Sequence, residues 1–260
     1  MSTALITGTP HSYPLYAEVR GEITRGLAGG EWKPGELIPS EADLAKRFGV
    51  SKGTIRHALD ELVSERILVR RQGRGTFVAT HSRDRTLYHF FHLIGRDGAR
   101  VLPDTKLLSY RVLRGSDEAC DTLGIERQSK LVGVRNLVTL GGEPVFIDEI
   151  LIPQASVPGL TESMYASRES TIYALYQSRF NINVIRISER LGAGPAPAQH
   201  AKLLGIRANA PVLVIDRVAY TYHDKPVELR KSWVNTGAYV YRSDLRKELT
   251  LNRNSLREMP

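Results

Sequence analysis

The stretch from residue 37 to residue 77 restricts the possible folds more than any other part of the chain. Ser40 precedes a short apolar pattern and is followed by Asp43, an acidic form of the capping box that satisfies the free N–H groups of a first helical turn. Gly49 can adopt the left-handed conformation that ends a helix, and Ser51 is a good N-cap for the next helix. The pattern therefore predicts two short helices joined by a tight turn.

The second of these helices is predicted to have one buried side and a basic leading end. Lys52, Gly53, Thr54 and Arg56 occupy its first turn and a half, largely off the apolar stripe. Arg56 can form a forked pair of hydrogen bonds with guanine, Lys52 can act as a point charge, and Gly53 allows the backbone to approach closely. This is how a recognition helix meets duplex DNA. The stripe recurs at helical spacing and consists of Ile55, Ala58, Leu59, Leu62 and Val63.

A basic hairpin is predicted directly after this helix. Residues 67–69 and 76–78 have the composition of strands, and the tip at 70–75 contains three arginines and no acid. Such a tip can contact phosphates and enter a minor groove, although a basic hairpin can also be simply solvated. Together with the helix pair, the hairpin predicts a winged helix-turn-helix, a fold that reads duplex DNA.

A set of short motifs runs through residues 13–79: Pro14-Leu-Tyr, Trp32-Lys-Pro-Gly-Glu-Leu-Ile-Pro-Ser-Glu, Leu44-Ala, Phe48-Gly-Val-Ser, Thr54-Ile-Arg-His-Ala-Leu and Gly73-Arg-Gly-Thr-Phe. These motifs resemble the DNA-binding domain of GntR-type bacterial transcription regulators. The resemblance implies DNA contacts at Lys52, Gly53, Thr54, Arg56, Gln72 and Gly73. The caps and the wing arginines complete the predicted DNA-binding set with Ser40, Ser51, Arg71 and Arg74. Many members of the family carry Arg where this chain has Ala42 and Lys52, so its operator preference is expected to differ.

Composition agrees with a nucleic-acid partner but does not decide it. The 260 residues carry a net charge of +8 and a pI near 9.6, which a basic enzyme or a peripheral membrane protein can also show. Cys120 is the single cysteine, so an intramolecular disulfide is excluded and a buried, inert thiol is expected. The N-terminus has no signal-peptide pattern, and no apolar run is long enough to span a membrane. We therefore expect a cytoplasmic, nucleoid-associated protein.

The polar segment 80–86 is predicted to be a linker between a domain at 13–79 and a second domain at 87–250. In the second domain, Gly141 and Gly142 form the turn of a hairpin. The pattern predicts strands at 106–114, 131–140, 144–152, 182–190, 211–223 and 227–235, and helices at 117–123, 170–180 and 196–204. The expected fold class is α+β, with an antiparallel sheet of about six strands in this domain.

Residues 85–248 carry looser motifs: Gly141-Gly-Glu-Pro-Val with Leu151-Ile-Pro, Ser170-Thr-Ile-Tyr, Leu203-Leu-Gly-Ile, Pro211-Val-Leu, and Pro226-Val-Glu with Ser232. They resemble the UTRA domain, the effector-binding half of HutC-type GntR regulators, whose fold is similar to chorismate lyase. By matching positions, the resemblance implies an effector pocket formed by Arg135, Asp148, Thr171, Glu228 and Ser232.

The predicted pocket residues suit a small polar ligand. Arg135 can form a forked pair of bonds with a carboxylate or phosphate, and Thr171 at a helix start adds donors to the same anion. Asp148 and Glu228 can accept bonds from hydroxyl or amine groups, while each charged strand residue can instead be solvated or belong to a structural ion pair. Strand alternation places Asp148 and Glu149 on opposite faces, so only one of them can line the pocket.

Two departures from the family narrow the expected ligand. Phosphosugar sensors tend to carry a second Arg at the position of Leu137 and a Tyr at the position of Val234. A carboxylate or amine-containing metabolite is therefore favoured over a phosphosugar.

The sequence leaves three functional hypotheses. The first is an effector-responsive regulator, a repressor acting as a homodimer on a two-fold operator and released by a small metabolite. The second is a DNA-tethered enzyme with a lyase-like domain, although the chain lacks a phosphate-binding glycine loop or a nucleophile motif and we expect no catalytic residues or cofactor. The third is a constitutive DNA binder. His89 and His92 have a spacing that a metal could use, but no acidic ligand lies nearby, so no metal site is expected.

Overall fold

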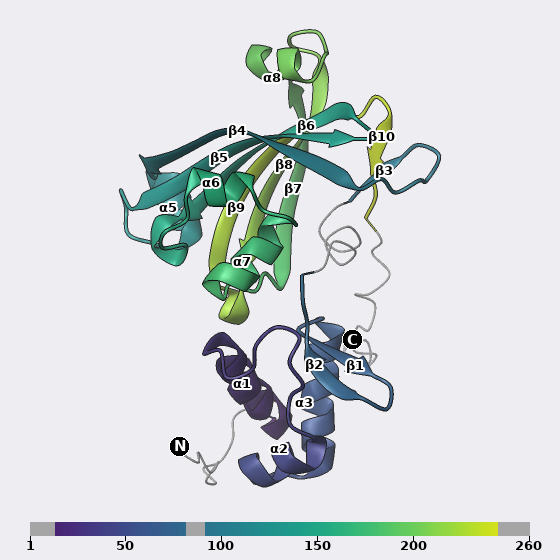
Figure 1. Ribbon diagram of the computed structural model, residues 1–260, viewed down its shortest axis with the longest axis vertical. Helices are drawn as coiled ribbons and strands as arrows, with labels where there is room; N and C mark the ends of the chain where they lie inside the picture. Colours follow the sequence, from purple (N-terminus) through teal and green to yellow (C-terminus); the bar gives the residue numbers. More distant parts are fainter. Residues whose placement is uncertain (1–13, 82–91, 244–260) are drawn as a thin grey trace, which may run out of the picture.

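The computed structural model describes residues 14–81 and 92–243, which form a helical N-terminal domain and a C-terminal domain built on a large sheet (Figure 1). The N-terminal domain contains α1 (Leu15–Ala28), α2 (Glu41–Phe48), α3 (Lys52–Ser64), β1 (Leu68–Arg71) and β2 (Gly75–Val78). β1 and β2 pair antiparallel, and Leu37 adds a bridge to Phe77. This is the predicted winged helix-turn-helix.

Local hydrogen bonds set the starts of α2 and α3. Ser40 Oγ accepts the backbone N–H of Asp43 at 3.2 Å, and Ser51 Oγ accepts that of Thr54 at 3.1 Å. Gly49 ends α2 with a φ of 70°, in the left-handed region that a glycine adopts without a steric penalty. Both predicted caps and the predicted helix stop are therefore present.

The apolar sides of α1 and α3 form the core of this domain. Trp32 is buried in this core, whereas Val63, which we placed in the stripe, is only partly buried. The buried members from α1, α2 and α3 are Val19, Ile23, Leu27, Leu44, Phe48, Ile55, Ala58, Leu59 and Leu62.

Six antiparallel strands form the sheet of the C-terminal domain, in the order β4-β5-β6-β9-β8-β7. They are β4 (Pro103–Arg114), β5 (Lys130–Leu140), β6 (Glu143–Pro153), β7 (Arg186–Pro195), β8 (Pro211–Tyr220) and β9 (Pro226–Val234). The sheet confirms the α+β class. Two predicted strand ends are wrong. Ile182 and Val184 enter the core before β7 starts, and β8 ends before a tight turn in which His223 has a φ of 58°.

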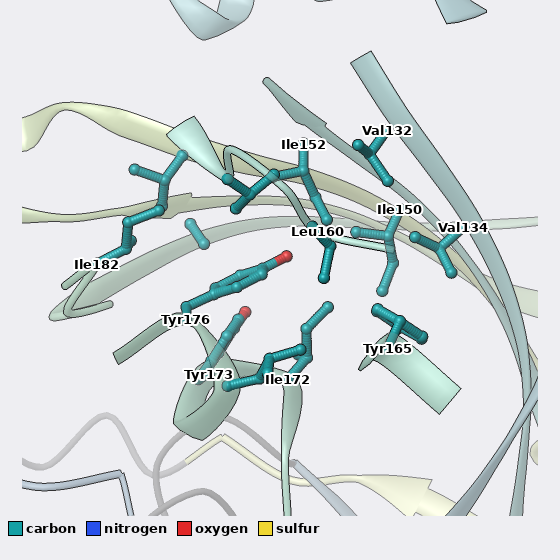
Figure 2. Packing of buried hydrophobic residues seen from close by; sticks show 14 of the residues in the cluster. Val132, Val134, Ile150, Ile152, Leu160, Tyr165, Ile172, Tyr173, Tyr176 and Ile182 are labelled. Carbon is teal, nitrogen blue, oxygen red and sulfur yellow. The ribbon is translucent and has the colours of Figure 1, made fainter. Parts of the chain in front are cut away.

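Helices pack on both faces of this sheet, and they are α5 (Asp117–Leu123), α6 (Glu162–Ala166), α7 (Ile172–Phe180) and α8 (Ala198–Leu203). Helices α6 and α7 lie on the face that carries Val132 and Ile150, whereas α5 and α8 lie on the face that carries Leu131 and Arg135. Tyr173 and Tyr176 of α7 pack with Val132 of β5 and Ile152 of β6 in the core between α7 and the sheet (Figure 2). Short α6 was not predicted, nor was the pair β3 (Leu93–Gly95) and β10 (Tyr239–Tyr241), because such short segments carry little periodicity.

Several predicted boundaries fall outside the described residues: most of the linker 80–86, the start of the second domain at 87 and its end at 250. His89 of the considered metal pair also lies outside them. Within the described ranges, no helix is long and apolar enough to cross a bilayer.

Candidate DNA-binding surface and effector cavity

The N-terminal end of α3 points away from the core. Ser51, Lys52, Gly53 and Arg56 are exposed and Thr54 is half-buried, because the buried stripe of α3 lies on its other side. The side chain of Arg56 is 63% exposed, so a cation stands at the surface one turn into the helix. The geometry suits a helix end that meets base edges and phosphates.

The wing presents the remaining predicted contacts. Arg71, Gln72, Gly73 and Arg74 are exposed at the β1–β2 turn, and Ser40 is exposed at the start of α2. Gly73 has a φ of 69°, a conformation that a side chain would strain. The Arg71 guanidinium lies 4.6 Å from the ring centroid of Phe77, which holds its stem against the wing. All ten predicted DNA-binding residues therefore lie at or near the surface around α3 and the wing.

Sequence reasoning missed an acid in this basic surface. Glu41, the first residue of α2, accepts bonds from Arg56 at 3.1 Å (Nε) and 2.9 Å (Nη2) and lies 3.5 Å from Arg70 Nη2. Arg70 also donates to Asp60 Oδ1 at 2.5 Å. The hydrogen bond and the charge of Arg56 lower the pKa of Glu41, although desolvation opposes them. The carboxylate therefore stays ionised between two arginines that come from different elements.

A cavity of about 260 Å³ lies in the C-terminal domain between the sheet face that α6 and α7 cover, the segment from α6 to α7, and the β3–β10 pair. Three of the predicted effector residues line it: Asp148, Thr171 and Ser232. Asp148 accepts Ser232 Oγ–H at 2.5 Å and Arg230 Nη1–H at 3.2 Å, and Thr171 caps α7 by accepting the N–H of Ala174. The structure thus brings β6, β9 and the start of α7 together around one space.

Arg135 does not lie at this cavity. The pairing register sets Arg135 opposite Glu149 and Asn136 opposite Asp148, so alternation turns Arg135 to the other face of the sheet. There it donates to Glu149 Oε1 at 2.9 Å and to Gln199 at 3.2 Å. Asn136 lines the cavity in its place. The placement of Arg135 in the pocket is therefore corrected to a structural ion pair.

Glu228 is also displaced from the predicted role, because it is fully buried behind the cavity wall. It accepts bonds from Tyr176 Oη at 2.6 Å, Tyr173 Oη at 3.3 Å, and Arg230 Nε and Nη2 at 3.0 and 2.8 Å. Burial lowers the pKa of Arg230, but Glu228, Tyr173, Asp148 and Tyr176 together outweigh burial and raise this pKa well above its ordinary value. Glu228 therefore holds the lining residue Arg230 as a fixed cation and is out of a ligand's reach.

Like Arg217 and Arg230, Arg168 lines the cavity and was missed by sequence reasoning. Its Nη1 donates to the carbonyl of Tyr165 at 2.6 Å, and its guanidinium lies 4.3 Å from the ring centroid of that tyrosine. Its Nε is buried without a hydrogen-bond partner, and no carboxylate of residues 14–81 or 92–243 forms an ion pair with it. It stands just before Thr171 and the positive end of α7, on a segment whose sequence has no periodic signal.

The cavity also contains a buried amide, that of Asn136, with a free hydrogen-bonding end. Asn136 is 2% exposed; its Nδ2 donates to Tyr165 Oη at 2.8 Å, and its Oδ1 has no partner. One end of this amide is thus left for a ligand, whichever way the amide is oriented. Arg217, which also lines the cavity, donates to Glu189 at 2.8 Å through Nε, and Tyr241 of β10 donates to the same carboxylate. The charge of Arg217 in this part of the cavity wall is therefore already paired with that of Glu189.

Helix α7 connects this cavity to the end of the wing. Gln177, on its later turns, accepts the N–H of His81 at 2.9 Å and donates to the carbonyl of Ala79 at 3.1 Å. It also donates to Asn183 at 2.9 Å, and Asn183 donates to Tyr222 Oη at 2.8 Å. The ring of Tyr222, in η2 (Tyr222–Asp224), packs into the core of the N-terminal domain. A buried polar bridge therefore joins the two domains through the helix that begins at the cavity.

Within the described ranges, no group of three or more His, Cys, Asp or Glu residues could hold a metal ion. His92, the described member of the considered pair, instead lies 3.9 Å from Glu189 at the cavity wall.

Comparison with known families matches both halves of the chain. Residues 15–78 match the model of bacterial regulatory proteins, gntR family, and residues 99–239 match the UTRA domain. The chain belongs to the GntR family. It is a DNA-binding transcription regulator of the type that carries an effector-binding UTRA domain, as the HutC-type motifs indicated.

Named relatives agree over most of their length. The regulator is 29% identical over 232 residues to the transcriptional repressor NagR of Bacillus subtilis, covering 89% of this chain and 91% of that one. It is 31% identical over 217 residues to a protein of Escherichia coli described as a probable transcriptional repressor of the fructoselysine utilization operon, covering 83% and 88%. The ligand-binding domain of a GntR-family regulator from Bordetella bronchiseptica superimposes with a TM-score of 0.59 at 30% identity, covering 61% of this chain and 98% of that one.

Proposed function

We propose that this GntR-family regulator is a repressor that binds its operator through α3 and the wing and is released when a small anionic metabolite occupies the cavity. The observation that carries the proposal is the position of α7: Thr171 at its start lines the cavity, and Gln177 near its end holds the segment that follows the wing. A ligand that favours one arrangement of α7 can therefore shift the geometry of the DNA-binding domain.

The charges of the cavity favour an effector with one carboxylate. Arg230 is neutralised by Glu228 and Asp148, and Arg217 by Glu189, so these cations are already paired. Arg168 remains, close to the N-terminus of α7. The guanidinium of Arg168 and the backbone N–H groups of this helix end can both donate hydrogen bonds to one anionic group. A single open cation suits a carboxylate better than a doubly charged phosphate. Three arginines and Tyr241 line the cavity, however, so the missing arginine at Leu137 and the missing tyrosine at Val234 no longer decide this.

The other end of the effector should carry hydroxyl or amine groups. Asp148 and Ser232 lie together on the sheet, and Asn136 has an unused amide end beside them. A cavity of about 260 Å³ is at the small end for ligand sites, which fits a compact metabolite. We propose that this ligand is bound and not turned over, so that its recovery unchanged after long incubation separates a sensor from an enzyme.

Two copies are proposed to act together. Winged-helix regulators read two half-sites about 34 Å apart, or a multiple of this, with a two-fold pair of recognition helices. A regulator of a bacterial family acts on chromosomal DNA, so we place the protein in the cytoplasm, at the nucleoid. Sedimentation of the protein with a selected operator duplex tests the stoichiometry.

The experiment that tests the function has two stages. A randomised duplex pool is selected with the full chain to obtain a consensus site, and metabolite pools are then screened by thermal shift. A ligand at 100 times its Kd stabilises the folded protein, raising its free energy of unfolding by about 2.7 kcal/mol. Carboxylates that stabilise the protein should also release the consensus duplex. Stabilisation without release, or release by every anion at equal strength, contradicts the proposal.

A further inference from the structure

Glu41 is an acid on a surface that has to approach phosphates. It is the first residue of α2, its side chain is 29% exposed, and the basic end of α3 lies beside it. A carboxylate at such a place repels the DNA backbone, so its presence weakens non-specific binding. Any favourable effect of Glu41 on DNA recognition must therefore act through the residues that it contacts.

The contact with Arg56 leaves one end of the guanidinium open. Glu41 takes the Nε and Nη2 side of the fork at 3.1 and 2.9 Å. A guanidinium carries five N–H groups, so the Nη1 end and the second hydrogen of Nη2 remain for another acceptor. The Arg56 side chain is still 63% exposed, and its open end is therefore available while its stem is held. An arginine held in this way can form a forked contact to guanine with little further ordering.

Glu41 also connects Arg56 to the wing. Arg70 of β1 lies 3.5 Å from the other carboxylate oxygen and donates to Asp60 of α3 at 2.5 Å. The chain of contacts from α2 to α3 and β1 sets the base of the wing against the recognition helix. Glu41 thereby links Arg56 to Arg70 at the base of the wing.

We infer that Glu41 is a positioning residue that sets sequence discrimination: by holding Arg56 and Arg70 it favours one forked contact with the operator and penalises binding to other DNA. The inference rests on the proposed DNA-binding role of α3. The carboxylate of Glu41 is thus a negative charge that improves specificity although it reduces the overall affinity for DNA.

Asp43 offers a matched control, because it lies in the same first turn of α2 and its described hydrogen bonds are to Ser40, not to Arg56. Asp43→Asn removes the same charge from the same helix end. It therefore reports what loss of charge and of helix-end stabilisation does without the contact to Arg56. A thermal melt of each variant shows that the domain remains folded.

The test compares dissociation constants for two duplexes, the consensus selected with the unmodified protein and a scrambled duplex of equal length. The ratio is the dissociation constant for the scrambled duplex divided by that for the consensus. Glu41→Gln should lower this ratio about tenfold, the size of one good base contact. The variant should bind the scrambled duplex as tightly as the unmodified protein does, or more tightly. Asp43→Asn should keep the ratio. In an Arg56→Ala background, Glu41→Gln should lower the ratio by much less than tenfold, since only the contact of Glu41 with Arg70 is then lost.

The outcomes separate the inference from the function it rests on. If the unmodified protein selects no consensus, the proposed operator binding and this inference both fall. A consensus that Glu41→Gln distinguishes from scrambled DNA as well as the unmodified protein does overturns the inference alone. An equal drop in the ratio with and without Arg56 also overturns it, because Glu41 would then act on the structure of the domain and not through Arg56.

Discussion

Both halves of the molecule hold an arginine with a glutamate, but in different surroundings. On the DNA-binding surface, Arg56 and Glu41 have side chains that are 63% and 29% exposed, and water screens their attraction. Behind the proposed effector cavity, Arg230 and Glu228 are 13% and 0% exposed, and either charge would be costly if left alone. An exposed pair can exchange one partner for a phosphate or a base, whereas a buried pair keeps both partners and fixes the position of the side chains that line the cavity. Binding to DNA should thus use the first kind of pair, and the shape of the cavity should depend on the second.

The comparison predicts the largest effect at Glu228. Glu228→Gln keeps the size of the side chain but removes the charge next to Arg230, which then keeps Asp148 as its one acidic partner among the described residues. We expect the free energy of unfolding of the C-terminal domain to fall by about 3 kcal/mol, the lower end of the range for a broken buried pair. Urea denaturation followed by tyrosine fluorescence measures it.

The control is Glu149→Gln, which removes a carboxylate that is 37% exposed and paired with Arg135 on the other sheet face. Its loss should cost much less, because water can replace the partner. Equal losses for the two variants would show that burial does not distinguish these pairs.

The second effect sharpens the comparison inside the cavity, where Arg168 is the cation without an acidic partner among the described residues. Arg168→Ala should weaken effector binding about tenfold to a hundredfold, as loss of a charged hydrogen-bond donor does, and leave operator binding unchanged. Arg135→Ala should leave effector binding in place, since Arg135 lies on the other face. Calorimetric titration with the effector found by thermal shift decides between them. A reversed order would restore the pocket expected from sequence.

The third effect concerns the junction between the two regions. Gln177→Met keeps the volume of the side chain but removes its bonds to Ala79, His81 and Asn183. Effector binding should persist, whereas the change in operator affinity on adding effector, typically 5- to 150-fold, should shrink toward none.

Arg179→Ala is the matched variant for this position, because it alters an exposed residue on the same helix. It should preserve the coupling. If Gln177→Met also preserves it, the signal does not pass through α7.

The smallest effect is a pH dependence on the outer sheet face. Burial lowers the pKa of His200 below its ordinary 6.5; Glu149 acts in the other direction and Arg135 adds to the lowering. The unfolded chain therefore binds a proton more readily, and folding stability should fall as the pH drops below 6.5 toward the lower folded value. Urea midpoints between pH 5 and 7.5 should show this slope, and His200→Gln should flatten it. His57→Gln, at a side chain 56% exposed, should leave the slope in place.

The two regions also differ in how far sequence reasoning reached them. Ser40, Gly49 and Ser51 act within a few residues of themselves, so the helix ends and the exposed leading end of α3 could be predicted. Arg135 was placed in the pocket by matching positions to the family, and alternation could not correct this, because it says that neighbours face opposite ways but not which face lines the cavity. Glu228 shows the same limit, since burial depends on what packs over a strand.

Other functional residues were missed because their partners are distant in the chain. Arg168 sits on an aperiodic segment, and only the packing of α7 on the sheet brings it to Asn136 and Asp148. The pairing of Glu41 with Arg70 joins two elements separated by the whole of α3. No local pattern of residue types encodes such contacts.

The sequence by itself determined the two domains, the caps that begin the recognition helix, the basic wing and the alternating strands, because each depends on steric and hydrogen-bond preferences of near neighbours. The tertiary structure alone decided which arginine reaches the effector cavity, which glutamate is sealed behind it and how α7 touches both domains. The physical reason is that strand register and helix packing are set by burial of apolar surface over the whole chain, and charged groups take whatever position that burial leaves them.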